Sequence, residues 1–106
     1  MYIPPKVASK VIRTALREKV KTLHVKLDRG TAYGWITIWA GDYWDFTEEE
    51  KRAIKEVLGE EAGGNCHVIS PESREFYIKK AIQSSEKARK VFSLWLLTAN
   101  LGSGKE

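Results

Sequence analysis

Five basic side chains near the N-terminus recur every three or four residues, a spacing that aligns them on one side of a helix. At 100° per residue they fall within about 80° of arc, along roughly 22 Å of helix. No acid falls inside this arc, although solvated helix faces usually alternate in sign because like charges four residues apart repel. Such a row of cations suits the phosphates of DNA or RNA, and the alternative is an ordinary solvated face. The five residues, here called the basic stripe, are Lys6, Lys10, Arg13, Arg17 and Lys21.

Aromatic and polar residues alternate in the stretch that follows, which also holds three of the four tryptophans. In a strand, alternate side chains point to the same face. Trp35 and Trp39 therefore share one face of one strand, and His24 and Lys26 share one face of another. Paired as a hairpin, the two strands present these four side chains together, as what we call the tryptophan face, with an aliphatic face behind them.

The tryptophan face has two interpretations. Rings beside cations resemble the surfaces that stack the bases of single-stranded nucleic acids. The alternative, which we favour from the sequence, is burial under the apolar last helix around Trp95 or against a second subunit. We also expect the first helix to lie on the aliphatic face with the basic stripe pointing away. The stripe and the tryptophan face would then lie about 20 Å apart and could not form one platform.

Catalytic and metal-binding groups are poorly represented. One cluster of titratable residues lies near the aromatic residues, and it consists of His24, Asp42 and Asp45. Nothing in their spacing favours a catalytic site over an ordinary loop. Cys66 and His67 are adjacent, so a strand would point them to opposite faces, away from a shared zinc ion. We expect no catalytic residue, no metal site and no cofactor.

Length and composition limit the class of protein. A chain of 106 residues corresponds to one domain, which we place at residues 1–101, with a disordered tail at 102–106. The single cysteine excludes an internal disulfide, so a cytoplasmic location is expected. No apolar run approaches the roughly 20 residues of a membrane span, so we expect no membrane partner.

Charge is segregated along the chain. Residues 1–29 hold eight basic residues and two acids, whereas residues 42–61 hold three basic residues and eight acids. The overall charge of +4 hides this contrast. A polarised protein of this size is typical of one that meets an anionic partner at its basic end.

Turn and capping signals divide the chain into seven elements. Prolines open the first helix, a capping box formed by Thr47 and Glu50 opens the second, and Gly59 ends it. The order helix, strand, strand, helix, strand, helix, helix predicts an α+β fold, with helices on a two- or three-stranded antiparallel or mixed sheet. The expected elements are a helix over 5–20, strands over 23–28 and 35–40, a helix over 47–58, a strand over 66–69, a helix starting at 70–72 and a helix over 85–100.

Three segments resemble a known family. They are a helix over Val7–Leu16, the hairpin string Gly30–Ile36 (Gly-Thr-Ala-Tyr-Gly-Trp-Ile), and the stretch from Gly64-Asn65 to Ser70-Pro71-Glu72. Together they cover about the first 80 residues and resemble the large polyvalent protein associated domain of phages and conjugative elements. The chain departs from that pattern in its aromatic loop at 43–46 and its apolar last helix. The resemblance implies a mobile-element or host-defence setting, but it supplies no catalytic residues to carry over and implies no activity.

The sequence therefore predicts a small non-enzymatic binding protein of a phage, virus or plasmid that engages DNA or RNA through the basic stripe. The alternative is a protein-interaction module or homodimer that inhibits or modulates a host factor. Residues that would stack bases or form that interface are Trp35, Trp39, His24, Lys26 and Trp95.

Overall fold

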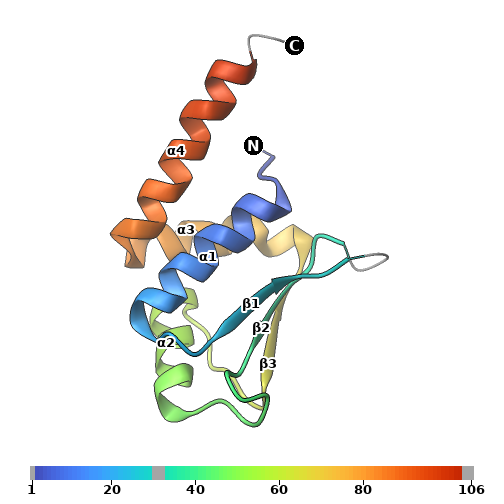
Figure 1. The fold of residues 1–106 in the computed structure, drawn as a ribbon, viewed down its shortest axis with the longest axis vertical. Coiled ribbons are helices and arrows are strands. Elements are labelled where there is room, and N and C mark those ends of the chain that lie inside the picture. The colour runs from blue at the N-terminus through green and yellow to red at the C-terminus, as the bar shows by residue number, and fades with distance from the viewer. Residues whose placement is uncertain (1, 30–32, 104–106) are drawn as a thin grey trace.

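The structure, a computed structural model, describes residues 2–29 and 33–103, with side chains described as far as residue 99. Within these ranges it contains four α-helices and one three-stranded antiparallel sheet in the predicted α+β order (Figure 1). The elements are α1 (Pro5–Lys19), β1 (His24–Leu27), β2 (Ile36–Trp39), α2 (Glu48–Leu58), β3 (Cys66–Ile69), the 3₁₀ turn η2 (Pro71–Ser73), α3 (Arg74–Ser84) and α4 (Glu86–Ser103).

Local signals account for the ends of α2. The Thr47 hydroxyl accepts a hydrogen bond from the Glu50 backbone N–H at 3.1 Å, and Glu50 Oε1 accepts one from the Thr47 N–H at 2.9 Å. This reciprocal pair is the predicted capping box. Gly59 ends the helix with a φ of +76°, a left-handed conformation that glycine adopts without steric cost.

The C-terminal helices start and end differently from the sequence prediction. A 3₁₀ turn comes first, so α3 begins at Arg74 rather than at the predicted Ser70-Pro71. Ser85 separates α3 from α4, close to the predicted start of the last helix at residue 85. Its hydroxyl accepts a hydrogen bond from the Ala88 N–H at 3.1 Å in the first turn of α4. Because α4 continues to Ser103, the first two residues of the predicted disordered tail are helical, and residues 104–106 lie outside the described residues.

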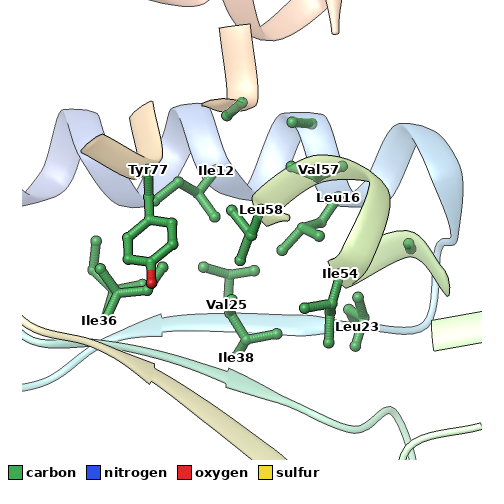
Figure 2. Close-up of a cluster of buried hydrophobic side chains, with 14 of the residues drawn as sticks. Ile12, Leu16, Leu23, Val25, Ile36, Ile38, Ile54, Val57, Leu58 and Tyr77 are labelled. Atoms are coloured by element: carbon green, nitrogen blue, oxygen red, sulfur yellow. The ribbon is translucent and has the colours of Figure 1, made fainter. Parts of the chain in front are cut away.

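The sheet has the strand order β1-β2-β3, with helices on one of its faces (Figure 1). Val25 pairs with Ile38, and Ile36 pairs with Ile69, so these aliphatic side chains point to the same face. Figure 2 shows Val25, Ile36 and Ile38 in a core that lies between the sheet and the helices α1 and α2, and Ile69 belongs to the same buried cluster. The predicted packing of the first helix on the aliphatic face is therefore confirmed.

The last helix packs against α1 and α3, not on the tryptophan face. Trp95 and Phe92 contact each other at 5.6 Å between ring centroids and pack against the core from the helical side. The prediction that this helix covers Trp35 and Trp39 is wrong, because α1 and α3 offer it apolar contacts on the helical side. None of the helices in the described ranges is long and apolar enough to cross a membrane.

Candidate functional site

The tryptophan face is open to solvent. Trp35 is 40% exposed, Trp39 is half-buried, and Val68 of the neighbouring strand β3 is 47% exposed on the same side. Thr37 lies between the two tryptophans and is buried, with its hydroxyl donating to Asp28 at 3.1 Å. The sheet thus presents rings and an aliphatic side chain where an antiparallel sheet usually presents polar residues to water.

Tyr43 adds a third ring to this face, which the sequence analysis missed. Its ring stacks on His24 at 5.3 Å between centroids and 10° between planes, and lies 6.0 Å from the Trp39 ring. The Lys26 ammonium donates to the Tyr43 hydroxyl at 3.0 Å and lies 5.0 Å from the ring centroid. Tyr43 is itself 48% exposed.

The backbone holds Tyr43 in place over the sheet. Its φ of +65° lies in the left-handed region, which is rare for a residue other than glycine and is often found at functional sites. Its carbonyl accepts from the Asn65 side-chain amide at 2.9 Å, and its N–H donates to the Ala40 carbonyl at 3.1 Å. Tyr43 lies in the turn after β2, where side chains do not alternate between faces. The periodicity of the strand therefore could not predict that its ring lies over the sheet.

The basic stripe is partly as predicted. Lys6, Lys10 and Arg17 are exposed, and Arg13 is half-buried. None of the ion pairs found among the described residues involves the stripe, so its charges are not neutralised internally. Lys21 lies beyond α1, which ends at Lys19, so four of the five residues of the stripe are helical.

The end of the stripe turns toward the sheet. The chain leaves the helix after Lys19, and the Arg17 guanidinium donates to the Lys21 backbone carbonyl at 3.1 Å. Lys21 then lines a hollow together with His24 and Asp42. The C-terminal end of the stripe therefore reaches the tryptophan face at His24.

The N-terminal end of the stripe also meets that face. Lys6 of α1 shares a hollow of about 600 Å³ with Lys26 and Leu27 of β1 and with Arg29 and Tyr33 of the hairpin. Since α1 lies over the edge strand β1, both ends of the stripe reach around that edge. The stripe and the tryptophan face thus meet at one hollow beside β1, and the predicted separation of about 20 Å between the stripe and the two tryptophans stays a prediction.

A buried carboxylate fixes the loop that carries Tyr43. Glu50 is 2% exposed, and its Oε2 accepts from the Thr22 hydroxyl at 2.7 Å and from the Gly41 N–H at 3.0 Å. Burial alone would raise the pKa of this carboxyl, but the hydrogen bonds from Thr47, Thr22 and Gly41 outweigh burial and lower it. Glu50 therefore stays ionised and ties β1 and the loop after β2 to the start of α2.

The three residues of the catalytic alternative, His24, Asp42 and Asp45, do not line one common hollow. His24 and Asp42 line one hollow that does not include Asp45. The His24 Nε2–H donates to the Gly41 carbonyl at 3.1 Å, and Asp42 Oδ1 accepts from the Trp44 N–H at 2.9 Å. Within the described ranges no cluster of three or more His, Cys, Asp or Glu residues has the geometry of a metal site.

A separate polar cluster links the end of α2 to β3 and α3. The Tyr77 hydroxyl donates to Glu60, whose other oxygen lies 2.9 Å from His67 Nε2 but out of line for a hydrogen bond. Burial, followed by the hydrogen bond and the charge of Glu60, raises the pKa of Tyr77 to about 12. The three residues are far apart in sequence, so spacing alone could not reveal the cluster.

Tyr77→Phe is expected to change how the free energy of unfolding depends on pH above pH 9. A tyrosine whose pKa is raised in the folded state stabilises the protein below pH 10, and this contribution is lost as the pH rises through 12. Between pH 9 and pH 12 the wild-type protein should lose about 2 kcal/mol more unfolding free energy than the variant. Urea unfolding at both pH values measures the difference, and equal losses in the two proteins would contradict the assignment.

The structure thus gathers four of the five predicted stacking or interface residues on one face, and leaves Trp95 on the other side of the molecule. It adds Tyr43 and Val68 to that face and connects it to the basic stripe along β1. Comparison of the chain with known protein families, curated proteins and solved structures found no match.

Proposed function

We propose that this chain is a non-enzymatic nucleic-acid-binding protein whose basic stripe and β1 edge contact phosphates. The observation that carries the proposal is the hollow in which Lys6 meets Lys26 and Arg29 beside Tyr33. Cations from a helix, a strand and a hairpin converge there, as a phosphate backbone requires of a protein that follows it. A mobile-element setting and a cytoplasmic location stay predictions from the sequence.

Charge distribution supports this proposal. The stripe has no internal ion pairs among the described residues, and the middle of the stripe, Arg13 and Arg17, lines a further hollow with Lys87 of α4. The acids of residues 42–61 are concentrated in and around α2, where several pair with lysines, as Glu48 does with Lys51 at 3.4 Å. The hollow with Lys87 also includes Glu18, so cations outnumber acids there by three to one, and this excess of positive charge favours an anionic ligand.

Salt dependence is the direct test of phosphate contacts. Binding of a labelled 12-nucleotide oligonucleotide, followed by fluorescence anisotropy between 50 and 200 mM salt, should weaken steeply. For five contacts the slope of log K against log salt should be about −3 to −4 on a single strand, and about −4 to −5 on a duplex. A flat response would remove the proposal.

Charge reversal locates the contacts. The double variant Lys6→Glu/Lys10→Glu should lose at least about tenfold in affinity at 100 mM salt and have a slope shallower by about 1.4 on a single strand. The matched control is Arg52→Glu/Lys79→Glu, which changes the net charge equally at exposed positions of α2 and α3. Equal losses in both variants would mean that net charge acts without a defined surface.

A protein-interaction role is the second candidate, and one observation favours it. Leu94 and Leu97 are exposed on α4, a helix that extends beyond the rest of the molecule (Figure 1). Exposed apolar side chains on one element are typical of contact with another chain. Sedimentation separates the two roles, because a tight dimer that ignores oligonucleotides would favour this one.

A further inference from the structure

We propose that the nucleic acid is single-stranded, with its bases stacked on Trp35 and Tyr43 and its backbone running along the edge of β1. This inference rests on the proposed function and specifies its ligand. It concerns the tryptophan face, which the phosphate contacts of the basic stripe do not require.

Two rings on this face are accessible to bases. Trp35 is 40% exposed and Tyr43 is 48% exposed, while Trp39 lies half-buried beside Tyr43. Trp35 directly precedes β2 and Trp39 ends it, so four residues of extended chain separate them by about 13 Å. That span fits the two or three bases that an open antiparallel sheet stacks in known recognition modes.

The cations lie where the phosphates of such a strand would run. Lys26 points to the same face as the rings and holds the Tyr43 hydroxyl at 3.0 Å. Next to it, Arg29 and Lys6 line the hollow at the β1 edge. Aromatic side chains would thus contact the bases on the sheet, and basic side chains would contact the phosphates at its edge. This is the pattern of single-strand binding surfaces.

Stacking discriminates between single strands and duplexes. In a duplex the faces of the bases are covered by their neighbours, so a ring on a sheet cannot reach them without unstacking. In a single strand the bases can be splayed out and laid on exposed rings. A face that offers rings as well as cations therefore gains affinity only from an unpaired strand.

Tyr43 is already held in position for this role. Its ring is supported from below by His24 at 5.3 Å, its hydroxyl by Lys26 and its carbonyl by Asn65. A side chain that is ordered before binding loses less conformational entropy when the ligand arrives. The left-handed φ of Tyr43 is consistent with a residue whose conformation is imposed by its surroundings.

The test compares one ring on the tryptophan face with one ring elsewhere. Trp35→Ala removes an exposed ring from the sheet, Trp35→Phe keeps a ring, and Phe76→Ala removes a 54% exposed ring from α3 as the matched control. Each variant is titrated with an eight-nucleotide single-stranded DNA, an RNA of the same sequence, and the corresponding duplexes, after circular dichroism has verified folding.

We expect the wild-type protein to bind single strands at least tenfold more tightly than duplexes, with quenching of tryptophan fluorescence. Trp35→Ala should weaken single-strand binding about fivefold or more and leave duplex binding and the salt slope unchanged. Trp35→Phe should retain most of the affinity, and Phe76→Ala should match the wild type. The DNA and RNA arms identify which strand is preferred.

Other outcomes separate the two proposals. If the charge-reversal variant loses binding but Trp35→Ala behaves like Phe76→Ala, with duplexes bound as tightly as single strands, the stacking inference is overturned and the phosphate contacts stand. If no oligonucleotide binds, both proposals fall. A wild-type dimer that Trp35→Ala converts to a monomer, with no oligonucleotide response, would make the face an interface between copies and overturn the inference.

Discussion

Replacing Glu50 with alanine is expected to lower the free energy of unfolding by about 3 kcal/mol or more. The substitution removes the acceptor of the Thr22 hydroxyl and of the Gly41 and Thr47 N–H groups, and a hydrogen bond to a charged group contributes about 1.5–3 kcal/mol. Glu49→Ala in the same helical turn is the control, because Glu49 is exposed. Urea denaturation of both variants gives the comparison, and similar midpoints would contradict a structural role for the Glu50 carboxylate.

The pH dependence of Glu50 provides an independent check. A carboxyl whose pKa is lowered in the folded state stabilises the protein above its ordinary pKa of about 4.5, and this contribution is lost as the pH falls through the folded-state pKa. Glu50→Gln removes the titration while keeping the shape of the side chain. We therefore expect the stability of the variant to fall less between pH 6 and pH 3 than that of the wild type.

Replacing Gly41 with alanine is expected to cost about 2–3 kcal/mol of stability. A Cβ atom at this position would lie 2.7 Å from the Thr22 carbonyl oxygen and 3.2 Å from Glu50 Oε2. The backbone of Thr22 cannot move aside without disturbing the hydrogen bond that its hydroxyl gives to Glu50. The cause is close approach of two chain segments rather than an unusual backbone angle.

Gly63→Ala is the matched control for this prediction. A Cβ atom at Gly63 would meet nothing within 4 Å, so the variant should stay within about 0.5 kcal/mol of the wild type. Thermal unfolding of both variants measures the contrast. Equal melting temperatures for Gly41→Ala and Gly63→Ala would show that the Thr22 segment yields easily.

Much of the fold was predictable because its signals are local. Thr47, Glu50 and Gly59 set the ends of α2 through hydrogen bonds and a backbone angle confined to a few neighbouring residues. The alternation of side chains along each strand is also a local signal, and it predicted which residues lie on the aliphatic face and which on the tryptophan face. The start of α3 was less predictable, since Ser70 and Pro71 permit a 3₁₀ turn as readily as a first helical turn.

The candidate site was predictable only in part because its decisive contacts are tertiary. Glu50 could be recognised as half of a capping box, but its bonds to Thr22 and Gly41 depend on segments that only folding brings together. Tyr43 reaches the sheet through a loop, which has no periodicity. The apolar stripe of α4 required a partner surface without specifying which one, and the helical side rather than the tryptophan face provides it.

The arrangement of α1 has a consequence for how the protein is made. The helices that α1 packs against most are α3 and α4, which follow the whole sheet in sequence. During synthesis, the side of α1 that faces them stays exposed to water until residues 74–99 have left the ribosome. The hairpin can pair early, but closure of the core depends on contacts between distant ends of the chain, which form slowly. The side of α1 that faces α3 and α4 therefore stays uncovered after the hairpin has formed, until those two helices have been made.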